Sequence, residues 1–251
     1  KKRKNAICLW LLFLLIYAPQ GVIASDYTYL YKDLPFRMEV LKKPEFPDLK
    51  VCITNYGAVP DGITLNTEAF NKAIDEVASK GGGTVNVPSG IWFTGPIVFQ
   101  SNINLHLERG AIILFTPDVN EYPLIQTVFE GQDTYRCQSP ISGIRLQNIA
   151  ITGQGVINGS GEAWRPLKRS KVTDGHWKDV TTSGGILKDP KLWFPSEKAL
   201  LGDELTANKD SRSFTKQDWL SIKDYLRPVL VSFIECKNVY LEGVLFENSP
   251  S

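Results

Sequence analysis

A short motif recurs at long intervals along this chain, and it restricts the folds open to the sequence. Residues 148–153 read Asn-Ile-Ala-Ile-Thr-Gly, residues 238–243 read Asn-Val-Tyr-Leu-Glu-Gly, and residues 102–105 are a weaker third copy. A further asparagine, Asn158 or Asn248, follows ten residues after each of the first two motifs begins. In a β-solenoid the asparagine satisfies backbone groups at a bend, the alternating apolar residues fill the interior, and the glycine turns the corner. We therefore predict a solenoid, although any single asparagine could be an ordinary turn residue.

Residues 84–115 have the pattern of strands and turns that such a fold requires. Short apolar or alternating runs are separated by tight turns. The runs are residues 84–87, 91–94, 97–99, 102–107 and 111–115. Two-residue Asn-Gly turns, a strong signal for hairpins, rarely join these runs. We therefore expect an all-β chain whose strands pair between coils, with His106 on the exterior because it alternates with two leucines.

A helix is predicted over residues 66–80, immediately before the strands. Its apolar stripe has helical spacing, and it consists of Phe70, Ala73, Ile74, Val77 and Ala78. Asn66 is placed to be the N-cap, and three glycines follow the helix, where they favour a C-cap over a phosphate-binding loop. The open end of a solenoid must be covered, and this helix is suited to cover it.

Two segments do not follow the repeat. Residues 25–50 are a proline-rich lead-in that we expect to be extended. Residues 159–226 are rich in charge and tryptophan and are interpreted as an inserted loop and helix region, of the kind that often lines the binding face of a solenoid. A helix is expected between Ser213 and Tyr225, capped by Ser213 or Thr215. We expect Trp219, Ile222 and Leu226 to lie on one face of this helix.

The N-terminal residues have the pattern of a signal peptide. Residues 1–4 are basic, residues 7–17 are almost entirely apolar, and small residues follow up to Ser25. The apolar run is short for a membrane span, although an uncleaved anchor is the alternative. We expect residues 1–24 to be removed and the protein to be secreted, periplasmic or extracellular, without a stable membrane span. The net charge of +1 argues against a dedicated nucleic-acid binder.

Four cysteines are present, and Cys8 lies in the predicted signal peptide. The remaining three, Cys52, Cys137 and Cys236, cannot all pair within the chain, and their spacing does not resemble a zinc site. We expect mostly buried thiols that behave as small apolar residues, and no metal site.

Several segments, taken in order, resemble glycoside hydrolase family 28, the polygalacturonase-like pectin hydrolases. The similar segments are residues 53–59, 61–62, 66–70, 81–85, 88–90, 94–97, 137–143, 149–159, 241–244 and 248–250. Together they cover almost the whole mature chain. The opening segment alone is shared with pectate lyases and phage tailspikes. The lead-in and the long insertion look more like the exo-acting bacterial and plant branch than like the compact fungal endo-enzymes.

This resemblance implies a right-handed, single-stranded parallel β-helix over residues 51–251. It also implies cofactor-free hydrolysis of α-1,4-galacturonosyl bonds, with inversion, in a monomer whose partner is pectic polysaccharide or oligogalacturonide. Inversion uses two carboxyl groups roughly 6.5–9.5 Å apart, with room for a water molecule. The family supplies them from an Asn-Thr-Asp motif and an Asp-Asp pair, aided by Gly-His-Gly and Arg-Ile-Lys motifs. These motifs are not found in the sequence, and the resemblance places them after Ser251. The sequence is therefore expected to be a C-terminally incomplete, inactive β-helix of low stability, and no catalytic residue is assigned.

Three residues are candidates for substrate binding. His176 and Trp177 could face a sugar, because tryptophan stacks on pyranose rings and histidine binds hydroxyl or carboxylate groups. A loop histidine and a packing tryptophan are the alternatives. The Arg227 guanidinium could reach a uronate or form a structural salt bridge. The basic residues 168, 169 and 171 suit a polyanion but are also typical of a solvated face.

Two other functional classes remain open from the sequence. A non-catalytic β-helix module would bind acidic polysaccharide without cleaving it. An eliminase of the pectate-lyase type would need Ca²⁺ held by clustered acidic residues, and the sequence shows no such cluster.

Overall fold

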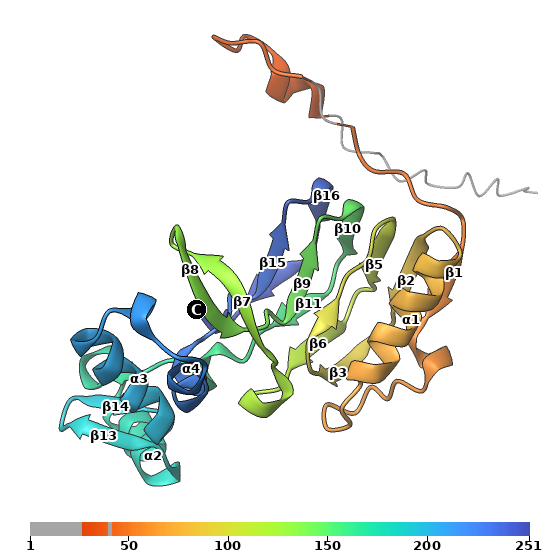
Figure 1. The fold of residues 1–251 in the computed structure, drawn as a ribbon. Helices are drawn as coiled ribbons and strands as arrows, with labels where there is room; N and C mark the ends of the chain where they lie inside the picture. The colour runs from red at the N-terminus through yellow and green to blue at the C-terminus, as the bar shows by residue number, and fades with distance from the viewer. Residues whose placement is uncertain (1–26, 40–41) are drawn as a thin grey trace, which may run out of the picture. The chain divides into compact units, whose positions relative to one another are not determined.

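The computed structural model describes residues 27–39 and 42–251 (Figure 1). The predicted signal peptide, residues 1–24, lies outside the described residues. The chain divides into two units, residues 1–42 and 43–251. Within the first unit the described residues form one 3₁₀ helix, Tyr27–Tyr31. No helix in the described ranges is long and apolar enough to cross a membrane.

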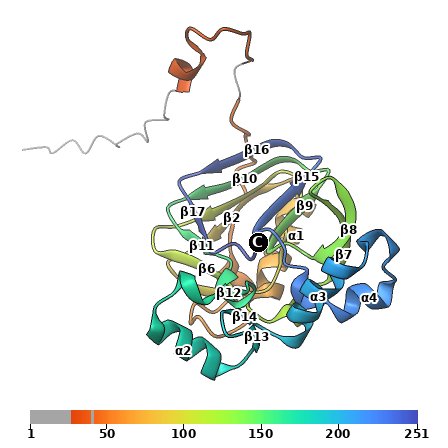
Figure 2. The ribbon, with the colours of Figure 1, turned by 90° about the vertical axis from the view of Figure 1, so that its left-hand side faces the viewer.

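The second unit is a stack of coils in which each complete turn consists of three short strands (Figure 2). The strands of the coils are, in chain order, β2 (Gly83–Val87), β3 (Gly90–Thr94), β4 (Ile97–Val98), β5 (Ile103–Leu107), β6 (Ala111–Phe115), β9 (Ile141–Ile144), β10 (Gln147–Gly153), β11 (Val156–Asn158), β15 (Val231–Ile234), β16 (Lys237–Glu242) and β17 (Leu245–Glu247). Coil 1 begins at β2, coil 2 at β5, coil 3 at β10 and coil 4 at β16.

Equivalent strands of successive coils pair in parallel and build three sheets. Sheet A has the order β1-β2-β5-β10-β16, where β1 is Lys50–Cys52. Sheet B has the order β17-β11-β6-β3, and sheet C has the order β15-β9-β4. This arrangement is a parallel β-helix, so the predicted fold class is confirmed.

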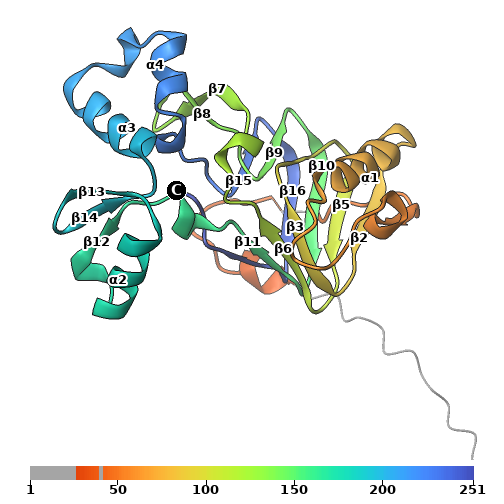
Figure 3. The ribbon, with the colours of Figure 1, turned by 90° about the horizontal axis from the view of Figure 1, so that it is seen from below.

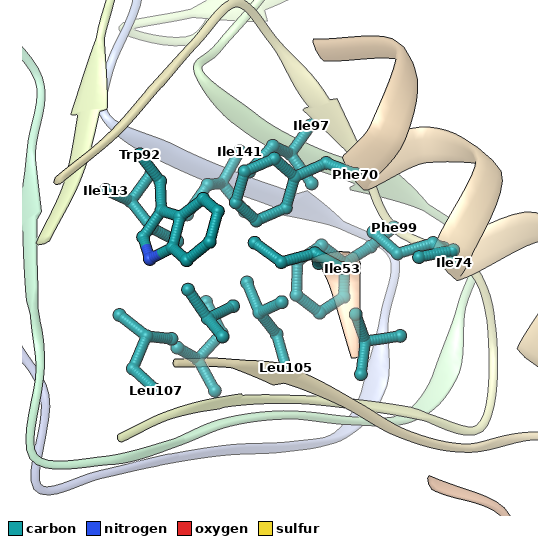
Figure 4. Close-up of a cluster of buried hydrophobic side chains, with 14 of the residues drawn as sticks. Ile53, Phe70, Ile74, Trp92, Ile97, Phe99, Leu105, Leu107, Ile113 and Ile141 are labelled. Atoms are coloured by element: carbon teal, nitrogen blue, oxygen red, sulfur yellow. The ribbon is translucent and has the colours of Figure 1, made fainter. Parts of the chain in front are cut away.

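Alternation along each strand fills the interior of the coils. In β2, β5 and β6 every second residue is buried. The register aligns Val85 with Leu105, and Leu105 with Ile151, so that apolar side chains stack from coil to coil. Figure 4 shows this core, in which Leu105 and Leu107 lie beneath Trp92 and Phe70. His106 points outward, where its Nδ1 lies 2.8 Å from the Thr152 hydroxyl of the next coil.

The asparagine ladder predicted from the repeat is present. The Asn148 amide donates to Asn102 Oδ1 at 3.1 Å, and the Asn238 amide donates to Asn148 Oδ1 at 2.8 Å. All three have positive φ, between 53° and 64°, a backbone region that asparagine enters more readily than most residues. The same side chain therefore both permits the bend and ties each coil to its neighbour.

Helix α1 (Thr67–Ser79) covers the interior at the coil 1 end. Phe70, Ala73, Ile74 and Val77 are buried against the core of the coils. Asn66 occupies the N-cap position, but the expectation that its side chain caps the helix is wrong. The Asn66 amide instead accepts from Val59 N–H and donates to the Val59, Thr64 and Phe93 carbonyls. It joins the loop before the helix to coil 1.

Residues 43–49 cross the outer face of sheet A. At one end Lys43 Nζ lies 3.1 Å from a Glu242 carboxylate oxygen and over the Tyr240 ring, both on coil 4. At the other end the chain enters β1, which pairs with β2. This part of the lead-in therefore passes over all four coils of the described unit.

Two excursions leave the coils at the same corner, between sheet B and sheet C. In coil 2 the antiparallel strands β7 (Leu124–Phe129) and β8 (Gln132–Cys137) form a hairpin. In coil 3, residues 159–230 form a larger lobe. Its main elements are β12 (Leu167–Lys168), α2 (Asp174–Ser183), β13 (Ile186–Asp189), β14 (Leu192–Phe194), α3 (Glu197–Asn208) and α4 (Lys216–Ser221). Figure 3 shows the lobe on one side of the coils, away from α1.

The helix expected between Ser213 and Tyr225 is shorter than predicted. It consists of α4 followed by a 3₁₀ turn at Lys223–Tyr225, and Thr215 provides the cap. Trp219, Ile222 and Leu226 do pack together in one buried cluster, but only Trp219 lies within α4, so they do not share one helical face. Hairpin β7–β8 was not predicted. Its turn is Glu130-Gly131, both with positive φ, rather than an Asn-Gly pair.

Candidate functional site

A cavity of about 250 Å³ lies where the outer face of sheet C meets hairpin β7–β8. Ser142 and Ser232, which are register partners on β9 and β15, line it from the sheet. Ile125, Phe129 and Arg136 line it from the hairpin. The strands supply a rigid floor, and the hairpin supplies an apolar wall that carries one cationic group.

Arg136 is the central charged residue of this cavity. Its Nε donates to the Arg227 carbonyl oxygen at 2.8 Å, and its guanidinium carbon lies 3.6 Å from the centre of the Phe129 ring. These two contacts fix the guanidinium and leave its two terminal nitrogens for other partners. Burial, and secondarily the charge of Arg227, lower the pKa of Arg136. An anion bound here would offset both effects.

Arg227, the substrate-binding candidate from the sequence, extends this positive region. It is half-buried and directly precedes Pro228 and Val229, which line the cavity. Its pKa is lowered first by burial, while the charge of Arg165 lowers it further. Among the described residues no carboxylate lies within salt-bridge distance of Arg136, Arg165 or Arg227. The three guanidinium groups therefore create a positive potential, which the charge of Glu130 offsets only in part at Arg136.

The rim of the cavity carries one ion pair. Arg145 Nε lies 2.6 Å from Glu235 Oε2, and both side chains are exposed. Glu235 is the one carboxylate among the described residues that line the cavity. Two carboxyl groups are needed for glycoside hydrolysis, so the described cavity has the composition of a binding site rather than of a complete catalytic one.

His176 and Trp177 lie elsewhere, on helix α2. The Thr173 hydroxyl accepts from the His176 backbone N–H, and Arg169 lies 5.9 Å from the Trp177 ring centre. Neither residue lines the cavity, and the structure does not bring them together with Arg227. Their role in sugar binding stays a prediction. In the neighbouring basic cluster Arg169 pairs with Asp174, while Lys168 and Lys171 are exposed.

One cysteine, Cys137, is among the residues that line the described cavity. It is buried, and burial raises the pKa of its thiol to about 12, which makes it a poor nucleophile. Cys52 and Cys236 are free and partly exposed. Within residues 27–39 and 42–251 no three His, Cys, Asp or Glu side chains gather as metal ligands.

Sequence reasoning found Arg227 but missed Arg136 and Phe129, because their hairpin was not predicted. The available signal was the pair of six-residue runs at 124–129 and 132–137 around Glu-Gly.

Comparison with known proteins agrees with this architecture. No family model matches the chain. A probable polygalacturonase from Vitis vinifera is 37% identical over 121 residues, which are 45% of this chain and 25% of that protein. The crystal structure of a hyperthermoactive exopolygalacturonase from Thermotoga maritima aligns with 83% of this chain at 33% identity and a TM-score of 0.59. These matches are to polygalacturonases, and they support a polygalacturonase-like relationship of the kind found in glycoside hydrolase family 28.

One curated protein of similar sequence is not named as a polygalacturonase. The plasmin and fibronectin-binding protein A of Streptococcus pneumoniae is 37% identical over 168 residues, which are 63% of this chain and 23% of that protein. The chain thus spans about a quarter of the length of these two curated relatives, and its alignment covers 44% of the Thermotoga structure.

Proposed function

We propose that the protein is a polygalacturonase-type glycoside hydrolase of pectin, and that the cavity over sheet C holds galacturonosyl residues of the substrate. The observation that carries this proposal is Arg136. On a family 28 scaffold, a partly buried guanidinium without a carboxylate partner among the described residues lies in a cavity on the outside of the coils. Galacturonan presents one carboxylate per sugar, which is the anion that such a group would bind.

The geometry explains how recognition would work. Because Nε of Arg136 is committed to the Arg227 carbonyl, a uronate carboxylate would bind through the two terminal nitrogens, in a charge-assisted, two-point contact. The outward hydroxyls of Ser142 and Ser232 lie on the floor, where sugar hydroxyls would hydrogen-bond. The apolar face of the ring would lie against Ile125 and Phe129.

Hydrolysis with inversion then requires an acid and a base on opposite sides of the scissile bond. Glu235 is paired with Arg145, so we assign the described residues to substrate binding and none to proton transfer. The expectation that the catalytic carboxylates follow Ser251 stays a prediction, as do action outside the cytoplasm and a monomeric state. Action outside the cytoplasm is supported by the basic and apolar pattern of residues 1–17.

Calorimetric titration with trigalacturonate tests the binding role. Losing a charge-assisted hydrogen-bonded contact costs about 1.5–3 kcal/mol, or roughly 10- to 150-fold in affinity. We expect that loss in Arg136→Gln and a smaller one in Arg136→Lys. Arg109→Gln is the matched control, because Arg109 is exposed, contacts Gln154 and lines neither cavity, and this variant should bind as the unmodified chain does. Equal binding of trigalacturonate and neutral galactotriose would contradict the proposal.

A binding module without hydrolytic activity is the second candidate. It is favoured by the lining of the cavity, in which Glu235 is the one carboxylate among the described residues and is paired with Arg145. Release of reducing ends from polygalacturonate by the full-length protein separates the two functions. Binding of polygalacturonate with no release under conditions where a family 28 enzyme is active would favour the module.

A further inference from the structure

Hairpin β7–β8 separates two cavities with different chemistry. Ile125, Phe129 and Arg136 point toward sheet C. Asp133 and Tyr135 alternate with them and point to the opposite side. There they line a second cavity of about 270 Å³ together with Ser211, Arg212, Phe214 and Trp219 of the lobe. The lobe thus provides the far wall of a site that is absent from the coils themselves.

The wall of the second cavity is aromatic and fixed in place. Trp219 is 6% exposed, and its ring centre lies 5.7 Å from that of Tyr135 and 4.8 Å from that of Phe214. Tyr135 and Phe214 are half-buried and keep part of their surface accessible. Trp219 is held from behind by Ile222 and Leu226. Aromatic faces that are held in this way are suited to pack against the C–H groups of a sugar ring.

Three carboxylates, Asp133, Asp210 and Asp218, and two cations, Lys209 and Arg212, surround this wall, so its charged groups sum to one negative charge. Lys209 lies 5.2 Å from the centre of the Phe214 ring and pairs with Asp218. Asp133 has no ion-pair partner among the described residues. Arg212 is already neutralised, because Asp210 accepts from its Nε and Nη2 at 2.6–3.0 Å. This contact, together with the Arg212 backbone N–H, lowers the pKa of Asp210 to about 2, so the pair persists throughout the neutral range. The hydroxyls of Thr134 and Ser211 complete the rim.

We propose that this second cavity binds a neutral saccharide, with its ring against Tyr135 and Phe214 and its hydroxyls donating to Asp133. A carboxylate in the cavity favours sugar hydroxyls and repels uronates, whereas Arg136 on the other face of the hairpin favours uronates. The two faces of one hairpin would therefore select acidic and neutral sugars. A polysaccharide that contains both kinds of residue would occupy both sites.

Saturation-transfer NMR on the full chain tests the proposal with methyl galactopyranoside, methyl arabinofuranoside, methyl rhamnopyranoside and, as the charged comparison, galacturonate. We expect at least one neutral glycoside to bind. Its affinity should fall at least fivefold in Asp133→Asn and in Tyr135→Leu. Asp179→Asn, a matched exposed substitution on α2, should leave it unchanged.

The same variants separate this proposal from the function of the first cavity. Trigalacturonate binding should not change in Asp133→Asn, and binding of the neutral glycoside should not change in Arg136→Gln. Three results would overturn the proposal. They are no binding of any neutral glycoside, equal binding of galacturonate that Asp133→Asn does not alter, and unchanged neutral-glycoside affinity in both Asp133→Asn and Tyr135→Leu. Asp133 is exposed, so a folding defect in its variant is not expected.

Discussion

Asn148 is the residue that links the backbone path to coil stacking. Its φ is 53°, and its amide joins Asn102 on one side to Asn238 on the other. We expect Asn148→Ala to lower the free energy of unfolding by about 2–4 kcal/mol, because it removes two hydrogen bonds and places alanine in the left-handed region. Asn148→Gly should cost less, since glycine adopts this φ without strain. Urea denaturation measures both.

Gln147→Ala is the control for this comparison. Gln147 is the exposed neighbour of Asn148, and its substitution should change stability by less than about 0.5 kcal/mol. If Asn148→Gly proved as costly as Asn148→Ala, backbone strain would not contribute, and the ladder would act through hydrogen bonds alone.

At the scale of elements, α4 supports the wall of the second cavity through its N-terminus. Asp218 accepts from the Thr215 backbone N–H at 2.7 Å and from its hydroxyl at 2.8 Å, and these bonds are the main cause of its lowered pKa. Because the pKa in the folded state lies below the unfolded value of about 3.9, this stabilisation is present above that value and is lost as pH falls through the folded pKa. Amide protection of residues 216–221 should therefore decrease below about pH 4 relative to β5.

Asp218→Asn tests that assignment. It should weaken α4 at neutral pH and remove the part of the pH dependence that belongs to this helix, as measured by NMR amide exchange. Asp179→Asn should change neither quantity. Constant relative protection of α4 between pH 5 and pH 2 in the unmodified chain would show that the capping box does not stabilise the helix.

The elements also show what the sequence could and could not predict. The coils were predictable because asparagine, alternating apolar residues and glycine recur at matched offsets, and each repeat faces the same environment. Helix α1 was predictable from its single apolar stripe. The hairpin and the lobe were harder, because their stability comes from contacts between distant segments, such as Tyr135 with Trp219. The candidate site was only partly predictable for the same reason. Arg227 was found because it precedes a coil strand, β15, whereas Arg136 is brought to the cavity only when the hairpin folds over sheet C.

For the molecule as a whole, both excursions gather on one side of the coils, next to sheet C. Both leave between sheet B and sheet C, so the hairpin and the lobe form one wall beside sheet C. Sheet A, by contrast, is crossed by residues 43–49, with Lys43 bound to coil 4. The repeated coils thus form the scaffold, and two insertions at a single corner line both of the cavities that we propose as binding sites.

The interior row that runs through all four coils tests how the stack is stabilised. Val85, Leu105 and Ile151 are fully buried, while Leu241, next in the row on coil 4, is 47% exposed. Leu105→Ala should lower the free energy of unfolding by about 2–5 kcal/mol, since it leaves a cavity between coils. Leu241→Ala should cost about 1 kcal/mol or less, because roughly half of its surface is already in water. Urea denaturation of the two variants gives the comparison directly.

An equal loss of unfolding free energy at both positions would mean that coil 4 is covered in solution. Sedimentation velocity would then show whether a second copy of the chain covers it.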